Sequence, residues 1–325
     1  MNALNETNQL SSAAPTCRAC GRPQDSHWPV HLVREQMFGL GTSHQYGECP
    51  DCGSLSLAQV PNLASYYPTD YYSQRQSQRP AIVELARWLI DWLALNIPGV
   101  SSRSPLPYLR RFKITRARRV LDVGCGAGHL LSRLSRLGYC DLQGVDLFLE
   151  GTTETSQFRL IEGTVSDLPD ERFFDLVILS HTLEHVPQPL ETLRAIARRL
   201  RPSGYVVVTV PVLGWAWRRY RSNWVQLDAP RHLTLFSLKG LEEVIASADL
   251  RLIERRFDST AFQFWGSQAY KKGLPLVDFL PPFGTPAWLW LQLKSLLWHP
   301  VASLLNLLKT GDQVTVVLQC KAPYN

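Results

Sequence analysis

From about residue 118 onward, short apolar segments alternate with segments of helical periodicity. Buried strands are expected at 118–125, 142–148, 159–163, 174–180 and 205–212, and helices at 127–138, 189–204 and 237–250. Apolar β-rich runs separated by helices predict βαβ units and a parallel sheet. Segments 251–259 and 311–325 predict two further strands, the last of them pairing antiparallel. The pattern therefore predicts an α/β fold with a doubly wound, mostly parallel sheet.

Two other segments are strongly apolar. In residues 81–97 the polar positions before Asn96 are Glu84, Arg87 and Asp91, which form one narrow stripe on an otherwise apolar helix. Residues 286–309, inside an insertion at about 260–310, are apolar but interrupted by polar residues and a proline, which argues against a membrane span. We expect the two segments to pack on each other as core helices. The alternative is an interfacial surface that lies on a membrane.

The chain divides into four parts by composition. Residues 1–16 look disordered, 17–75 carry paired cysteines, 76–115 hold the apolar helix and a linker, and 116–325 form the main domain. The 325 residues are 45% hydrophobic and 19% charged, which is typical of a folded globular protein. No secretory signal is visible, so a cytoplasmic location is expected, with peripheral contact to the inner membrane face as an open alternative.

Four cysteines occur as two close pairs. Cys17, Cys20, Cys49 and Cys52 have the spacing C-x2-C-x28-C-x2-C. Two such pairs suit tetrahedral coordination of zinc, and four thiolates leave no open position for catalysis. We therefore predict a structural zinc site in the N-terminal module. The remaining cysteines are interpreted as packing residues.

A glycine-rich loop follows the first predicted strand of the main domain. Gly124, Gly126 and Gly128 let the backbone turn tightly and approach a ligand closely. Asp146 ends the next strand, 22 residues after Gly124, where a carboxylate can accept hydrogen bonds from ribose hydroxyls. The loop and the acid together predict a site for a nucleoside cofactor.

These residues resemble the class I S-adenosylmethionine-dependent methyltransferases. LDVGCGAGHLL is similar to the first motif of that family, GVDL to its ribose acid, GTVSDLP to its adenine segment and LRPSGYVVVTVP to its fifth strand. The resemblance implies a seven-stranded sheet with S-adenosylmethionine over the carboxyl ends of the strands. The positions that it assigns to the cofactor are Asp122, Gly124, Gly126 and Gly128 at the methionine portion, Asp146 at the ribose, Asp167 and Leu168 at the adenine, and His181 at the edge of the site.

The zinc module combined with this core resembles a bacterial group linked to sugar and polysaccharide modification. Its sugar C-methyltransferases carry His-Glu-His before a Phe-Ser pair; here DAPRHLTLFS (228–237) keeps only the last histidine, His232. The resemblance implies a small-molecule or glycan acceptor, such as a lipid- or nucleotide-linked sugar. Methylation of a hydroxyl or carbon requires loss of a proton, and His232 and His185 are the candidate bases.

His185 ends the string His181-Thr-Leu-Glu184-His185, which has the spacing of a zinc-peptidase helix. A strand runs directly into His181, and Pro187 and Pro189 prevent a helix from continuing, so we reject the peptidase interpretation. The string also resembles Glu-x-x-Glu-His in ubiquinone-pathway O-methyltransferases, which leaves a divalent metal open. Tyr71 and Tyr72 are candidates to close over the cofactor.

The positive net charge leaves RNA methylation open as a second function. The chain carries +6, and both a zinc module and basic patches fit RNA binding. Methylation of exocyclic base amines is disfavoured because no Asn/Asp-Pro-Pro-aromatic motif follows the fourth strand, but ring-nitrogen or ribose methylation stays open. The WAWRRYRSNW stretch (215–224) could stack on a sugar and bind a phosphate. A non-catalytic scaffold is the third alternative.

Overall fold

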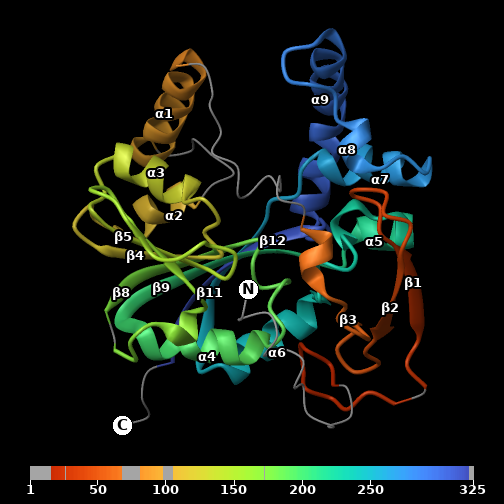
Figure 1. Ribbon diagram of the computed structural model, residues 1–325, viewed down its shortest axis with the longest axis horizontal. Coiled ribbons are helices and arrows are strands. Elements are labelled where there is room, and N and C mark those ends of the chain that lie inside the picture. The colour runs from red at the N-terminus through yellow and green to blue at the C-terminus, as the bar shows by residue number, and fades with distance from the viewer. Residues whose placement is uncertain (1–15, 26, 68–80, 98–104, 172, 322–325) are drawn as a thin grey trace.

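The computed structural model describes residues 16–25, 27–67, 81–97, 105–171 and 173–321 (Figure 1). The disorder expected for the N-terminus and the role considered for Tyr71 and Tyr72 therefore lie outside the described residues.

The centre of the molecule is a mixed sheet of eight strands within the described residues, in the order β11-β12-β9-β8-β4-β5-β7-β6. Its strands are β4 (Arg119–Val123), β5 (Asp141–Asp146), β6 (Thr153–Glu154), β7 (Arg159–Glu162), β8 (Phe174–Ser180), β9 (Leu200–Pro211), β11 (Leu250–Phe257) and β12 (Gln313–Cys320). The five neighbouring strands β9, β8, β4, β5 and β7 are parallel to one another, and β12 runs antiparallel between β9 and β11. The seven predicted strands are all present, and the two-residue β6 adds an eighth at the edge.

Helices cover both faces of this sheet, as the doubly wound prediction requires. On one face lie α4 (Pro189–Arg199) and α6 (Leu238–Ser247), and on the other α2 (Leu106–Arg111) and α3 (His129–Arg136). Side chains of β8 alternate between the two cores, with Val177 on the α4 side and Leu176 and Ile178 on the α3 side. Because both faces of β8 are buried, successive positions from Leu176 to Leu179 are all apolar.

A second, four-stranded sheet holds the N-terminal module. It consists of β1 (Val30–Arg34), β2 (Ser43–Glu48), β3 (Leu55–Leu57) and β10 (Thr234–Leu235). The last of these belongs to the main domain: β10 pairs antiparallel with β3, and Thr234 lies opposite Ser56. The module is therefore built into the main domain and shares a sheet with it.

The remaining helices lie mainly at the other end of the chain. They are α1 (Ala81–Asn96), α5 (Trp215–Tyr220), α7 (Phe262–Lys271), α8 (Leu276–Phe279) and α9 (Pro286–Leu307), together with single 3-10 turns at Leu63–Tyr66, Val165–Asp167, Arg221–Asn223 and Val225–Leu227. Among the described residues, no helix combines the length and apolar character that a membrane crossing needs.

The expectation that residues 81–97 and 286–309 pack on each other is wrong. In Figure 1, α1 and α9 project from the same side of the molecule but stand apart. The buried residues of α1 are Asp91 and Ala94, whereas Ile82 is 75% exposed. The polar stripe of α1 faces α3, where Asp91 pairs with Arg133. Near the end of the helix Ala94 is buried and Leu95 packs against the core, whereas most of its large apolar residues are exposed.

Candidate active site

The loop after β4 adopts a conformation that only glycine takes without strain. Gly124, Gly126 and Gly128 have φ values of +74°, +50° and +76°. A Cβ on Gly124 would lie 2.5 Å from Oγ1 of Thr182, so that position also has no room for a side chain. The hydroxyl of Thr182 in turn donates to the carbonyl of Val123 at 2.9 Å. The loop after β8 therefore lies directly against the glycine loop.

Two carboxyl groups flank the glycine loop at the ends of adjacent strands. Asp146 ends β5, and its Oδ2 accepts a hydrogen bond from the backbone N–H of Gly126 at 2.8 Å. Asp122, in β4, is buried, and burial together with the charge of Asp146 raises its pKa to about 7. A cation bound beside Asp122 would restore its charge, because an opposite charge favours the ionised form. These acids suit a ligand with hydroxyl groups and an ammonium.

Asp167 and Leu168 follow β7 at the same edge of the sheet. One carboxylate oxygen of Asp167 accepts hydrogen bonds from the backbone N–H and the hydroxyl of Thr164, at 2.7 and 2.8 Å. This caps the turn Val165–Asp167 and holds the segment in place. Leu168 is buried. Contact of these two residues with an adenine ring stays a prediction.

His181 begins the loop after β8, and its φ of +56° is unusual for a residue with a side chain. Its Nδ1 lies 3.2 Å from Oε1 of Glu184, whose side chain is fully buried. Burial disfavours the charge on both groups, but their hydrogen bond and attraction outweigh it, so the pKa of His181 is raised and that of Glu184 is lowered. Residues 181–185 form a turn rather than a helix, in agreement with our rejection of a peptidase.

His185 and His232 come together, with ring centroids 4.6 Å apart. Nδ1 of His232 lies 2.8 Å from the carbonyl of Gln226, and Nδ1 of His185 lies 2.9 Å from the carbonyl of Arg231. A carbonyl can only accept, so each Nδ1 carries the hydrogen and each neutral ring keeps its lone pair on Nε2. Both histidines are thus set as proton acceptors.

Two carboxylates lie close to the free nitrogen of His232. Its Nε2 is 4.0 Å from Oε1 of Glu184 and 3.9 Å from Oδ2 of Asp228. Burial, with a smaller contribution from His185, lowers the pKa of His232 to about 4. The ring is therefore neutral near pH 7, and the two carboxylates would stabilise the imidazolium formed when it takes a proton.

Comparison with known proteins finds a family match for the central part of the chain. Residues 100–255 match the family described as "Methyltransferase domain". The match contains the glycine loop, both acids and the turn at His181. This part of the chain is similar to a methyltransferase domain, and its sheet has the fold of the class I methyltransferases.

Curated relatives match only part of the protein. A ubiquinone biosynthesis O-methyltransferase of Neisseria meningitidis serogroup C is 33% identical over 113 residues, which are 31% of this chain and 47% of the relative. One from Paracidovorax citrulli is 39% identical over 102 residues, covering 27% and 42%. The chain thus spans less than half the length of these relatives. Among solved structures, an S-adenosylmethionine-dependent methyltransferase from Mesorhizobium loti aligns with a TM-score of 0.42 at 16% identity, over 66% of this chain and 97% of that one.

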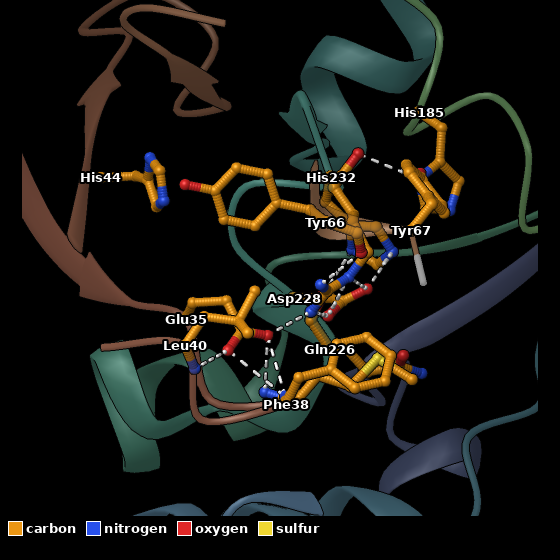
Figure 2. A network of polar contacts seen from close by, with 12 residues as sticks. Glu35, Phe38, Leu40, His44, Tyr66, Tyr67, His185, Gln226, Asp228 and His232 are labelled. Atoms are coloured by element: carbon orange, nitrogen blue, oxygen red, sulfur yellow. Dashed lines mark hydrogen bonds and ion pairs between the residues drawn. The ribbon is translucent and has the colours of Figure 1, made fainter. Parts of the chain in front are cut away.

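Three charged residues beside the methyltransferase site were missed by the sequence analysis. Arg231 is fully buried and donates to Asp228 at 2.6 Å and to Glu35 of the N-terminal module at 2.8 Å. Figure 2 shows Glu35 and Asp228 in this network of polar contacts. Its guanidinium also donates to the carbonyl of Tyr66 at 3.2 Å. The dense group of charges at 228–232 was a signal for Asp228 and Arg231, whereas nothing in the local pattern indicates Glu35.

The N-terminal module supports the segment that carries His232. The hydroxyl of Tyr46, in β2, donates to the carbonyl of His232 at 2.7 Å. The next two residues, Leu233 and Thr234, donate their N–H groups to the carbonyl of Glu184 at 2.8 and 3.1 Å. The module therefore supports the His232 segment, and backbone hydrogen bonds within the main domain join that segment to the loop that carries Glu184 and His185.

The four predicted zinc ligands converge. Their sulfur atoms lie within 4.8 Å of one another, with Cys17 3.6 Å from Cys52 and Cys20 3.5 Å from Cys49. Tetrahedral zinc with Zn–S bonds of about 2.3 Å requires sulfurs roughly 3.8 Å apart. The cluster therefore fits such an ion with small adjustments.

Within the aromatic stretch at 215–224, Trp217 is buried and cannot stack on a sugar, whereas stacking by the half-buried Trp215 and Tyr220 stays a prediction. Trp217 and Trp224 are buried in the core beneath the four-stranded sheet. The indole N–H of Trp224 donates to the buried carboxyl of Asp312 at 2.9 Å, which explains how a polar group is tolerated there.

Proposed function

We propose that the protein transfers a methyl group from S-adenosylmethionine to a hydroxyl group of a small-molecule or glycan acceptor. The observation that carries the proposal is the contact between the glycine loop and the loop after β8, made by Thr182 and Val123. This contact brings a cofactor site and a pair of histidines to the same edge of the sheet. The names of the curated relatives support transfer to oxygen.

The residues present fit S-adenosylmethionine. The glycine loop leaves room for close approach, Asp146 can accept from ribose hydroxyls, and Asp122 can pair with an ammonium. Asp167, Leu168 and His181 complete the predicted contacts. When bound, the cofactor supplies a methyl group on a positively charged sulfur. Holding the acceptor oxygen in line with that methyl is the main catalytic task of the protein.

His232 is the proposed proton acceptor. The bound cofactor would supply the methyl group and retain the electrons of the broken carbon–sulfur bond on sulfur, and Nε2 of His232 would accept the proton that the acceptor hydroxyl loses. The carboxylates of Glu184 and Asp228 stabilise the resulting charge. His185 is partly exposed and lies against His232, so it can pass the proton to solvent.

A metal-assisted version of this reaction is the second candidate. Glu184, His185 and His232 offer ligand atoms within 4.8 Å of one another. Among the described residues no hydrogen-bond partner reaches Oε2 of Glu184, although this atom is buried. A divalent cation held there would lower the pKa of a bound hydroxyl. Activity that is lost with a chelator and restored by one divalent metal, while the cysteine-bound zinc stays in place, would select this version.

The acceptor that we propose is a sugar or a lipid- or nucleotide-linked saccharide, and a structural zinc ion is proposed for the cysteine cluster. RNA methylation remains the competing hypothesis. The test is incorporation of labelled methyl groups into a panel of sugar nucleotides, lipid-linked saccharides, phenols and structured RNAs. Labelling of RNA alone would contradict a small-molecule or glycan acceptor.

The variant His232→Gln keeps a polar side chain but cannot accept the proton, and we expect its turnover to fall on the order of 100-fold or more. His27→Gln is the matched control, because the side chain of His27 is 91% exposed and remote from the site. Equal turnover of His232→Gln and wild type would remove His232 as the base.

A further inference from the structure

We propose that α1 and α9 together form a docking surface for an anionic lipid bilayer. The two helices rise from the same side of the molecule (Figure 1). Each leaves large apolar side chains uncovered; these include Ile82, Leu85, Leu89 and Ile90 on α1 and Leu289, Trp290, Leu293, Leu296, Leu297, Leu304 and Leu307 on α9. Uncovered apolar surface on this scale marks a site of interaction.

The orientation of α1 is held by its charged residues. Asp91 pairs with Arg133 at 2.5 Å, and Glu84 pairs with Arg136, both on α3. These pairs turn the only two acids of the helix toward the methyltransferase domain. Rotation that buried the apolar face would break both pairs, so the outward display of the apolar face is built into the fold.

The α9 helix has the composition of an interfacial helix. Its 22 residues include a single charged residue, Lys294, whose ammonium lies 3.3 Å above the ring of Trp290. Tryptophan and lysine favour the boundary between water and lipid, where the ring is partly buried and the charge meets anionic headgroups. Lys309 follows the helix and is also exposed.

Charge complementarity favours lipid as the occupant. Both acids of α1 are paired, and α9 has no acid. The exposed charges at α9 and from the end of α7 to α8 are the basic residues Lys294, Lys309, Lys271 and Lys272 and one acid, Asp278, so this region is basic in balance. A basic surface with exposed apolar side chains binds anionic bilayers both by burying the apolar side chains and by attracting the anionic headgroups.

Docking would also orient the active site, a consequence that rests on the proposed function. A cavity of about 180 Å³ lies between the inner face of α9, α2 and the end of β11, lined in part by Tyr108, Asp258 and His299. Thr209 lines it too, and its carbonyl accepts the N–H of His181. An acceptor whose polar head enters this cavity while its apolar tail remains in the bilayer would lie against Thr209, next to the segment that begins at His181. We therefore assign the acceptor to amphiphilic, membrane-held molecules.

The test is flotation of the full chain with vesicles of phosphatidylcholine alone or mixed with phosphatidylglycerol. We expect binding that increases with the anionic lipid and weakens with salt. Leu85→Glu and Leu297→Glu place a charge at positions that are 63% and 75% exposed, and each should weaken binding on the order of tenfold. Leu32→Glu, at a position 64% exposed on β1, is the matched control and should bind as wild type does.

Binding of S-adenosylhomocysteine, followed by calorimetry, reports on the cofactor site separately. Failure of the wild type to float while it still binds this ligand would overturn the docking surface and leave the proposed function standing. Equal flotation of all four proteins would also overturn it. A stable dimer in light scattering that Leu297→Glu dissociates, without vesicle binding by the wild type, would assign the surface to a second copy of this chain.

Discussion

Replacing Arg231 by methionine should destabilise the protein strongly. The side chains of Arg231 and Glu35 are fully buried and that of Asp228 is 13% exposed, so removal of the guanidinium leaves two carboxylates without their cation. Breaking a buried pair in this way costs about 3–5 kcal/mol of unfolding free energy. Lysine should not rescue the loss, because an ammonium cannot reproduce the planar fork that reaches Asp228, Glu35 and the carbonyl of Tyr66.

The assay is urea unfolding followed by tryptophan fluorescence and circular dichroism. Arg194→Met is the matched control, because Arg194 pairs with Glu191 on the surface, where the two side chains are 42% and 56% exposed. Loss of that pair should change the unfolding free energy by less than about 0.5 kcal/mol. If Arg231→Met unfolds within 1 kcal/mol of Arg194→Met, roughly the scale of an ordinary substitution, the network does not carry the stability assigned to it.

Three further predictions concern the glycine loop, the proposed zinc site and His232. Gly124→Ala puts a Cβ 2.5 Å from the Thr182 hydroxyl and should weaken binding of S-adenosylhomocysteine at least about tenfold in calorimetry, whereas Gly151→Ala, with equally unusual φ but open space, should not. Cys17→Ser should lower the zinc content measured by plasma mass spectrometry and also reduce turnover, because the module supports the His232 segment; full zinc content would contradict the site. The pKa of His232 is about 4 in the folded protein, below its value near 6.5 in the unfolded chain. Between these pH values the unfolded state binds more protons, so the free energy of unfolding falls as the pH falls. His232→Gln should remove about 3 kcal/mol of that loss, and an unchanged pH profile of unfolding would refute the lowered pKa of His232.

Much of the fold follows from local patterns. Strands of the parallel sheet carry apolar runs, such as Leu176–Leu179 in β8, because both faces are buried, and the glycine loop combines positive φ with close packing against Thr182. Both signals are readable in a single sequence, since they depend on residue type and short spacing. The cysteine spacing likewise predicted the sulfur cluster, because each pair sits on one tight turn.

The features that could not be predicted from the sequence depend on contacts between residues far apart in the chain. The strand β10 has only two residues and is a strand only because it pairs with β3, about 180 residues earlier in the chain. Glu35 joins the site through Arg231, and no local pattern links them. The apolar character of α1 was plain, but periodicity shows only that the two faces of a helix differ. Which face points outward was decided by the ion pairs with α3.

The most direct test of the central claim is calorimetric titration of the purified chain with S-adenosylmethionine. We predict binding of one molecule per chain. Asp146→Ala, which removes the carboxylate expected to accept from the ribose, should weaken this binding at least about tenfold, since hydrogen bonds to a charged group are worth about 1.5–3 kcal/mol. Absence of heat from the wild-type protein at millimolar ligand, while the protein remains folded, would contradict the assignment of this chain as an S-adenosylmethionine-dependent methyltransferase.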